Sequence, residues 1–109
     1  DEISPYAKTN VIQLKDGKIS EIIIDPKELN VNANKFENLI GDDAKFNASK
    51  IIDIFKGKDN DFSKAVCLNT AAGLIVNETH QNFADAYNNA RDHILSKKAA
   101  KYLEKIQNG

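Results

Sequence analysis

Asp1 and Glu2, the first two residues of the chain, are its best candidates for metal chemistry. Mg²⁺ prefers carboxylate oxygens, and it usually keeps several waters and takes phosphate oxygens from a substrate. Neighbouring side chains of a strand point to opposite faces, so two adjacent carboxylates can share one ion only in a loop. Ser4-Pro5 predicts such a loop, because the residue before a proline is disfavoured in the helical region. An acidic pair is nevertheless a very weak motif, and two solvated carboxylates are the simpler interpretation.

The other reactive side chains fit structural roles better. His80 and His93 have no second His or Cys at metal-ligand spacing, which is typical of surface histidines. Cys67, the only cysteine, lies in an apolar stretch and is predicted to pack rather than to react. Asn69 lies in the same stretch, where an amide must find partners. We expect it to bond to a loop or a strand end, with substrate contact as the alternative. No residue stands out as catalytic or cofactor-binding.

Composition and motifs argue against several classes of partner. The sequence contains no GxGxxG or GxxxxGK[ST] pattern that would cradle a phosphate. A net charge of −1, with Arg91 as the one arginine, argues against a nucleic-acid partner. The longest apolar stretch, 62–76, is too short for a membrane span, which needs roughly 20 apolar residues. A lone cysteine fits a reducing compartment, so we expect a cytoplasmic location.

The periodicity of apolar residues predicts one β-hairpin followed by four helices. Residues suited to strands occupy about 9–14 and 18–25 on either side of Asp16-Gly17, the strongest short hairpin signal. A two-residue turn would pair Leu14 with Ile19 and Val11 with Ile22. Apolar residues then recur at helical spacing, and helices are expected at about 43–56, 61–77, 82–95 and 97–107.

Capping residues set the expected ends of these helices. Gly57 is predicted to terminate the first helix, and Asn60 or Asp61 to begin the second. Asn82 is expected to cap the third helix and Ser96 the fourth.

The predicted core is centred on residues 62–76, which are apolar nearly all round and therefore typical of a buried helix. Ile22–Ile24 is apolar on both faces, so at least one strand should be covered on both sides. The inward face of the first helix is expected to consist of Ala44, Ala48, Ile51, Ile52 and Phe55. That of the third helix is expected to consist of Phe83, Tyr87, Ala90 and Ile94, and that of the last helix of Ala99, Leu103 and Ile106.

Three stretches, taken in order, resemble the anthranilate phosphoribosyltransferase family. They are the opening Asp1–Ser4 (DEIS), the hairpin Leu14–Ile19 (LKDGKI), and the pair of segments at 41–48 and 68–72 (GDDAKFNA and LNTAA). The resemblance runs essentially from residue 1 to the end of the chain. The chain opens on Asp and contains no Met, so we expect an internal piece of a longer protein.

The resemblance implies an α/β parent fold, in which residues 1–109 form the C-terminal segment of the large α/β domain. The N-terminal helical domain and the glycine-rich loop of the family are absent from this sequence. It also implies transfer of phosphoribosyl from phosphoribosyl pyrophosphate to anthranilate in tryptophan biosynthesis, by an enzyme that is a homodimer when full-length. A family Asp-Glu pair helps to hold Mg²⁺ and matches Asp1 and Glu2. Residues 1–109 alone are expected to be inactive.

One departure from the family and two alternatives accompany this interpretation. Lys97 follows Ser96 where a glycine is common in the family, which leaves the turn at that corner open. The first alternative is a relative of the pyrimidine nucleoside phosphorylases, against which the Asp1-Glu2 opening argues. The second is a helical interaction module without chemistry.

Overall fold

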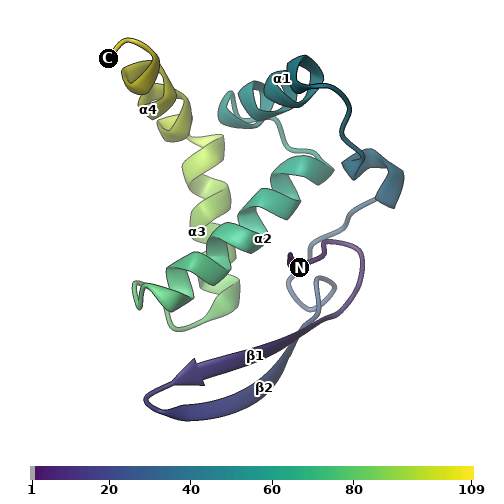
Figure 1. Cartoon of the computed structure of the whole chain (residues 1–109), viewed down its shortest axis with the longest axis vertical. Helices are drawn as coiled ribbons and strands as arrows, with labels where there is room; N and C mark the ends of the chain where they lie inside the picture. Colours follow the sequence, from purple (N-terminus) through teal and green to yellow (C-terminus); the bar gives the residue numbers. More distant parts are fainter. Residues whose placement is uncertain (1) are drawn as a thin grey trace.

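The computed structural model describes residues 2–109, and the predicted metal ligand Asp1 lies outside them. The described chain begins with an antiparallel hairpin of β1 (Thr9–Lys15) and β2 (Lys18–Ile24) (Figure 1). A short 3-10 helix, η1 (Phe36–Leu39), leads into four α-helices. These are α1 (Ala44–Phe55), α2 (Asp61–Val76), α3 (Phe83–Leu95) and α4 (Lys98–Gln107). The predicted hairpin and four helices are confirmed, as expected for part of an α/β domain.

The hairpin has the predicted turn and register. Asp16 and Gly17 have φ angles of 52° and 73°, so both turn residues take the left-handed conformation that a two-residue hairpin turn needs. Leu14 lies opposite Ile19, and Val11 opposite Ile22. The alternation along each strand therefore divides the side chains of the hairpin between two faces.

Two of the three caps predicted at helix starts, those of α2 and α3, are confirmed, and Asp43 caps α1. The Asp43 carboxylate accepts a hydrogen bond from the Phe46 amide at 2.8 Å. Asn60 and Ser63 form a reciprocal capping box at the start of α2. The Asn82 side chain accepts from the amide of Asp85, at 3.1 Å.

The predicted cap of the last helix is wrong, although the helix begins within one residue of its expected start. Ser96 closes α3 instead, and its hydroxyl donates to the carbonyl oxygen of His93 at 2.9 Å. Lys97 precedes α4 with φ of 62° and no side-chain cap. This left-handed conformation favours glycine, so a glycine would fit the corner with less strain than Lys97 does.

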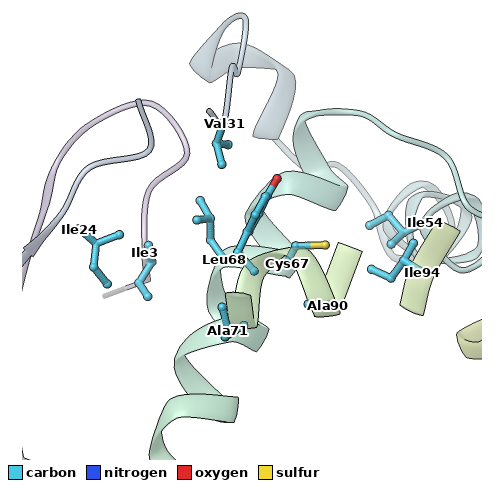
Figure 2. Packing of buried hydrophobic residues seen from close by; sticks show 11 residues of the cluster. Ile3, Ile24, Val31, Ile54, Cys67, Leu68, Ala71, Ala90 and Ile94 are labelled. Carbon is cyan, nitrogen blue, oxygen red and sulfur yellow. The ribbon is translucent and has the colours of Figure 1, made fainter. Parts of the chain in front are cut away.

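The core lies between α2, α3 and the first residues of the chain (Figure 2). Leu68 and Ala71 of α2 are fully buried, and Ile3 and Ile24 pack at one side of the same cluster. The inward stripe of α3 is as predicted, with Tyr87, Ala90 and Ile94 buried and Phe83 half-buried. The helix predicted to be central is therefore central, although Val66 and Val76 on its surface are exposed.

The predicted inward face of α1 is wrong. Ile54, which is not on that face, is 4% exposed, whereas Ile51 and Ile52 lie partly in solvent. Figure 2 shows Ile54 beside Ile94 of α3. The apolar spacing of α1 is compatible with two different buried faces, because Ile51, Ile52 and Ile54 lie close together in the sequence. The spacing alone therefore does not identify the face that packs on the core.

The hairpin and α4 are less covered than predicted. Ile24 is buried, but Ile22 and Ile23 are exposed, so neither strand has both faces covered by the described residues. On α4, Leu103 is half-buried and Ile106 is exposed. Among the described residues, no helix has the length and apolar character needed to cross a membrane.

Candidate functional site

Glu2, the described member of the predicted metal pair, lies at the edge of a hollow beside α2. The hollow has a volume of about 510 Å³, and the Glu2 side chain is exposed on it. The remaining lining residues come from η1 and from one side of α2: Leu39, Phe62, Ala65, Val66, Asn69 and Thr70. Asp1, the other member of the predicted metal pair, lies outside the described part of the chain.

Asn69 attaches the segment after Glu2 to the central helix. Its Oδ1 accepts a hydrogen bond from the Ile3 amide at 2.9 Å, and its Nδ2 donates to the Ile3 carbonyl at 3.1 Å. Nδ2 also donates to the carbonyl oxygen of Ala65, one turn earlier in α2, at 2.9 Å. The carboxamide thus pairs with both backbone groups of one residue, as a neighbouring strand would. The predicted structural bond of Asn69 is confirmed.

Ser4 shapes the loop that follows. Its hydroxyl accepts hydrogen bonds from the amides of Tyr6 and Ala7, at 3.1 and 3.2 Å. Its own amide donates to the hydroxyl of Thr9 at 3.1 Å, at the start of β1. The predicted loop at Ser4-Pro5 is therefore held by local hydrogen bonds on one side and by Asn69 on the other.

Asp61, the first residue of α2, is a buried carboxylate that joins three segments. Its Oδ2 accepts from the Tyr6 hydroxyl at 3.0 Å, the Asn34 amide at 3.1 Å and the Asn38 side chain at 3.0 Å. Lys64 lies one turn further on, with Nζ 3.5 Å from Oδ1. Asp61 thereby links the N-terminal loop and the segment around η1 to the central helix.

These hydrogen bonds govern the protonation of Asp61 and Tyr6. Burial raises the pKa of Asp61, but hydrogen bonds from Asn38, Asn34 and Tyr6 outweigh it and lower the pKa to about 2. Burial and the hydrogen bond to the Asp61 carboxylate raise the pKa of Tyr6 to about 12. The carboxylate therefore stays ionised and the phenol stays protonated near neutral pH, in the states that their hydrogen bond requires.

The sequence indicated Asp61 only as a possible helix cap, and this role was not predicted. The signal was an acid at the first position of a largely apolar helix, because a buried carboxylate must find several donors. Its donors are spread from residue 6 to residue 38, so no local motif contains them.

Cys67 and the two histidines behave largely as predicted. Cys67 is buried, and burial raises the pKa of its thiol to about 11, which disfavours the reactive thiolate. His93 is exposed on α3. His80 is half-buried in the turn before α3, with Nδ1 3.3 Å from the Thr79 hydroxyl.

The chemistry of the N-terminal donors fits magnesium better than a softer metal. Within residues 2–109, no three His, Cys, Asp or Glu side chains cluster as a closed metal site. The exposed Glu2 carboxylate offers hard oxygen donors at the rim of an open hollow. Such donors suit an ion that keeps water and takes phosphate oxygens from its substrate.

Comparison with known proteins gives a consistent result. The family model described as "Glycosyl transferase family, a/b domain" matches residues 1–100. The anthranilate phosphoribosyltransferase of Pelagibacter ubique is 73% identical over 108 residues, which cover 99% of this chain and 33% of that relative. The corresponding enzyme of Caldanaerobacter subterraneus is 39% identical over 85 residues, covering 78% of this chain and 25% of the relative. That of Alkaliphilus metalliredigens is 34% identical over 94 residues, covering 86% and 28%. The chain spans about a third of the length of these relatives or less.

Proposed function

The chain belongs to the glycosyl transferase family with the a/b domain, and from this premise we propose that it is the C-terminal part of an anthranilate phosphoribosyltransferase. The observation that carries the proposal is the 73% identity to the Pelagibacter relative over nearly the whole chain. Supporting it, the matched region includes the hairpin, all four helices and the acidic opening. The parent domain would supply the glycine-rich loop, the helical domain and the remaining substrate contacts.

The proposed reaction transfers a phosphoribosyl group in tryptophan biosynthesis. The amino nitrogen of anthranilate forms a bond to the ribose carbon of phosphoribosyl pyrophosphate as the bond from that carbon to pyrophosphate breaks. Pyrophosphate leaves with the bonding electron pair, and the amine loses a proton to solvent. No side chain of residues 1–109 acts as a nucleophile in this displacement.

Residues at the start of the chain would assist the departure of pyrophosphate. Asp1 and Glu2 would hold a Mg²⁺ ion, which when bound neutralises negative charge on the diphosphate. Asn69 would hold the backbone that follows Glu2 on the rigid central helix, so that the carboxylates need little reorganisation. We further propose that the full-length enzyme is a homodimer, as the family resemblance implies, and that it is cytoplasmic, as the lone cysteine predicts.

A chimera tests this proposal directly. Residues 1–109 replace the matching third of the Pelagibacter relative, and formation of phosphoribosyl anthranilate is followed at saturating Mg²⁺. We expect turnover comparable to that of the intact relative. A folded chimera without turnover would contradict the proposed function.

The metal role of the opening is tested in the same chimera by Glu2→Gln. Loss of one carboxylate should weaken the apparent affinity for Mg²⁺ by about tenfold or more, because a neutral amide is a poorer ligand for this ion. Direct binding of Mg²⁺ in the presence of phosphoribosyl pyrophosphate, followed by calorimetry, provides a readout that is independent of turnover. Glu104→Gln on α4 is the matched control and should change neither quantity. Equal Mg²⁺ affinity in the two variants would remove Glu2 from the metal site.

A further inference from the structure

One side of the hairpin presents an apolar surface that the described chain leaves uncovered. Its residues are Ile12 and Leu14 on β1 and Ile19 and Ile23 on β2, here called the outer face. Their exposed fractions are 73%, 71%, 75% and 62%. Leu14 and Ile19 lie directly opposite each other in the register, so the exposed side chains adjoin across the two strands.

The opposite side of the hairpin is turned to the core. Ile24 is buried and Val11 is half-buried against the same cluster that contains Ile3. Figure 1 shows α2 on one side of the hairpin, which projects from the lower end of the molecule. The exposure of the outer face therefore follows from docking on one side only.

An exposed apolar surface of this kind is typically covered by another part of the protein or by a partner. A two-stranded hairpin is marginally stable in water unless further strands or helices cover it. Contiguous apolar patches on soluble proteins mark interaction sites far more often than free surface. One charged residue, Glu21, lies on the same side of the hairpin as the outer face, directly opposite Ile12 in the register.

We propose that the outer face is covered by the rest of the transferase, the two-thirds of the relatives' length outside residues 1–109; this inference rests on the proposed function. The Pelagibacter relative contains about three times the length of the matched region. The matched family model is an a/b domain, whereas the described residues contain only a two-stranded sheet. The main sheet and its covering helices would then lie in the remainder of the protein, and the layers of such a domain bury apolar faces against one another.

A second copy of the chain fits the outer face less well. A two-fold contact would bring the same patch together on both copies. Glu21 lies on the same side of the hairpin, so this contact would bury one carboxylate from each copy in apolar surroundings, which costs desolvation free energy. The remainder of the transferase can instead place a cation or hydrogen-bond donor opposite Glu21.

Accessibility of the outer face provides the first test. Ile19→Cys is introduced into the 109-residue chain and into the chimera described above, and alkylation of each site is followed by mass spectrometry of its peptide. Cys67 is buried and serves as the slow internal reference. We expect alkylation at position 19 to be at least about tenfold slower in the chimera than in the chain alone. Equal rates would overturn the proposal.

A charged substitution provides the second test, because its expected effect on the melting temperature differs between the two proteins. Ile19→Lys should leave the melting temperature of the chain nearly unchanged, because the side chain is exposed. In the chimera it should lower the melting temperature by about 5 °C or more, because the lysine would enter an apolar contact. Ile19→Val is the matched control and should shift either protein by little. A neutral Ile19→Lys in a folded chimera would overturn the proposal.

The outcomes separate this inference from the proposed function. A chimera that is protected at position 19 but inactive supports the interface and contradicts the activity. An active chimera with an accessible position 19 supports the activity and contradicts the interface. A chain that sediments as a dimer and is protected at position 19 assigns the face to a second copy. A chimera that does not fold counts against both proposals, since a chain 73% identical to the segment it replaces should assemble with the remainder.

Discussion

Two polar side chains of α2, Asn69 and Asp61, connect the central helix to segments far away in the sequence. Asn69 bonds to Ile3, 66 residues earlier, and Asp61 bonds to Tyr6, 55 residues earlier. Both contacts act on the segment that carries the acidic opening. Individual hydrogen bonds therefore hold the backbone next to Glu2, the described one of the two proposed metal ligands, against the core.

The first prediction concerns Asn69→Ala. The substitution removes three hydrogen bonds and leaves the Ile3 backbone groups partly buried without partners. We expect the free energy of unfolding to fall by about 1–3 kcal/mol. Urea denaturation measures this, and hydrogen exchange at the Ile3 amide should accelerate. Thr70→Ala, an exposed neighbour on the same helix, is the control, and a similar loss in both variants would contradict the role given to Asn69.

The second prediction concerns the acid dependence of stability. The pKa of Asp61 is about 2 in the folded chain, below its ordinary value of 3.8. The resulting stabilisation, about 2 kcal/mol, is fully present above the ordinary pKa and is lost as pH falls through the folded value. Stability measured by urea denaturation from pH 6 to pH 2 should therefore fall less steeply for Asp61→Asn than for the unmodified chain. Asp92→Asn, an exposed acid on α3, controls for the lost charge. Identical slopes for the unmodified chain and Asp61→Asn would refute this assignment.

At the scale of elements, three consecutive helices end in the same way. Gly57, Glu78 and Lys97 follow α1, α2 and α3, and each has a positive φ between 59° and 91°. After α1, the Gly57 amide donates to the Ile54 carbonyl at 2.9 Å and the Lys58 amide to the Asp53 carbonyl at 3.0 Å. This pair of bonds is a Schellman motif, which is best served by glycine because the left-handed conformation strains a residue with a Cβ.

The third prediction is a pair of substitutions with opposite signs. Lys97→Gly should raise the free energy of unfolding by about 0.5–1 kcal/mol, because it relieves the left-handed conformation at φ of 62°. Gly57→Ala should lower it by about 1 kcal/mol for the converse reason. Thermal and urea denaturation measure both. Lys97→Ala removes the same charge but keeps a Cβ, so a gain equal to that of Lys97→Gly would show that charge rather than conformation is responsible.

At the scale of the whole molecule, the core is asymmetric. Buried residues gather where α2 meets α3 and the N-terminal segment, whereas the hairpin and α4 carry exposed apolar side chains such as Leu14 and Ile106. Glu2 lies on an open hollow rather than in an enclosed site. This distribution supports the proposal that the chain is part of a larger domain, since the relatives it matches are about three times as long.

The fourth prediction concerns the chain by itself. We expect no turnover of phosphoribosyl pyrophosphate by residues 1–109, because the proposed catalytic cleft needs the rest of the domain. Mg²⁺ should also bind the chain weakly, since two carboxylates without a phosphate ligand displace few of its waters. Calorimetric titration should show no saturation at concentrations that saturate the chimera in the presence of substrate. Turnover by the chain alone would contradict this prediction.

The sequence by itself determined the features that depend on a few neighbouring residues. The Asp16-Gly17 turn, the hairpin register and the helices were predictable because turn conformation, capping and periodicity are local properties. The start of α2 was predicted at Asn60 or Asp61 for the same reason, and the structure shows Asn60 as the cap.

Only the tertiary structure decided which surfaces meet. Ile54 rather than Ile51 is buried, because packing against α2, α4 and Ile94 of α3 selects one of two possible stripes on α1. The donors of Asp61 come from two separate segments, the N-terminal loop and the segment around η1, and the partner of Asn69 could not be read from its own neighbours. Packing and long-range hydrogen bonds depend on residues that are distant in sequence, and they therefore appear only once the chain is folded.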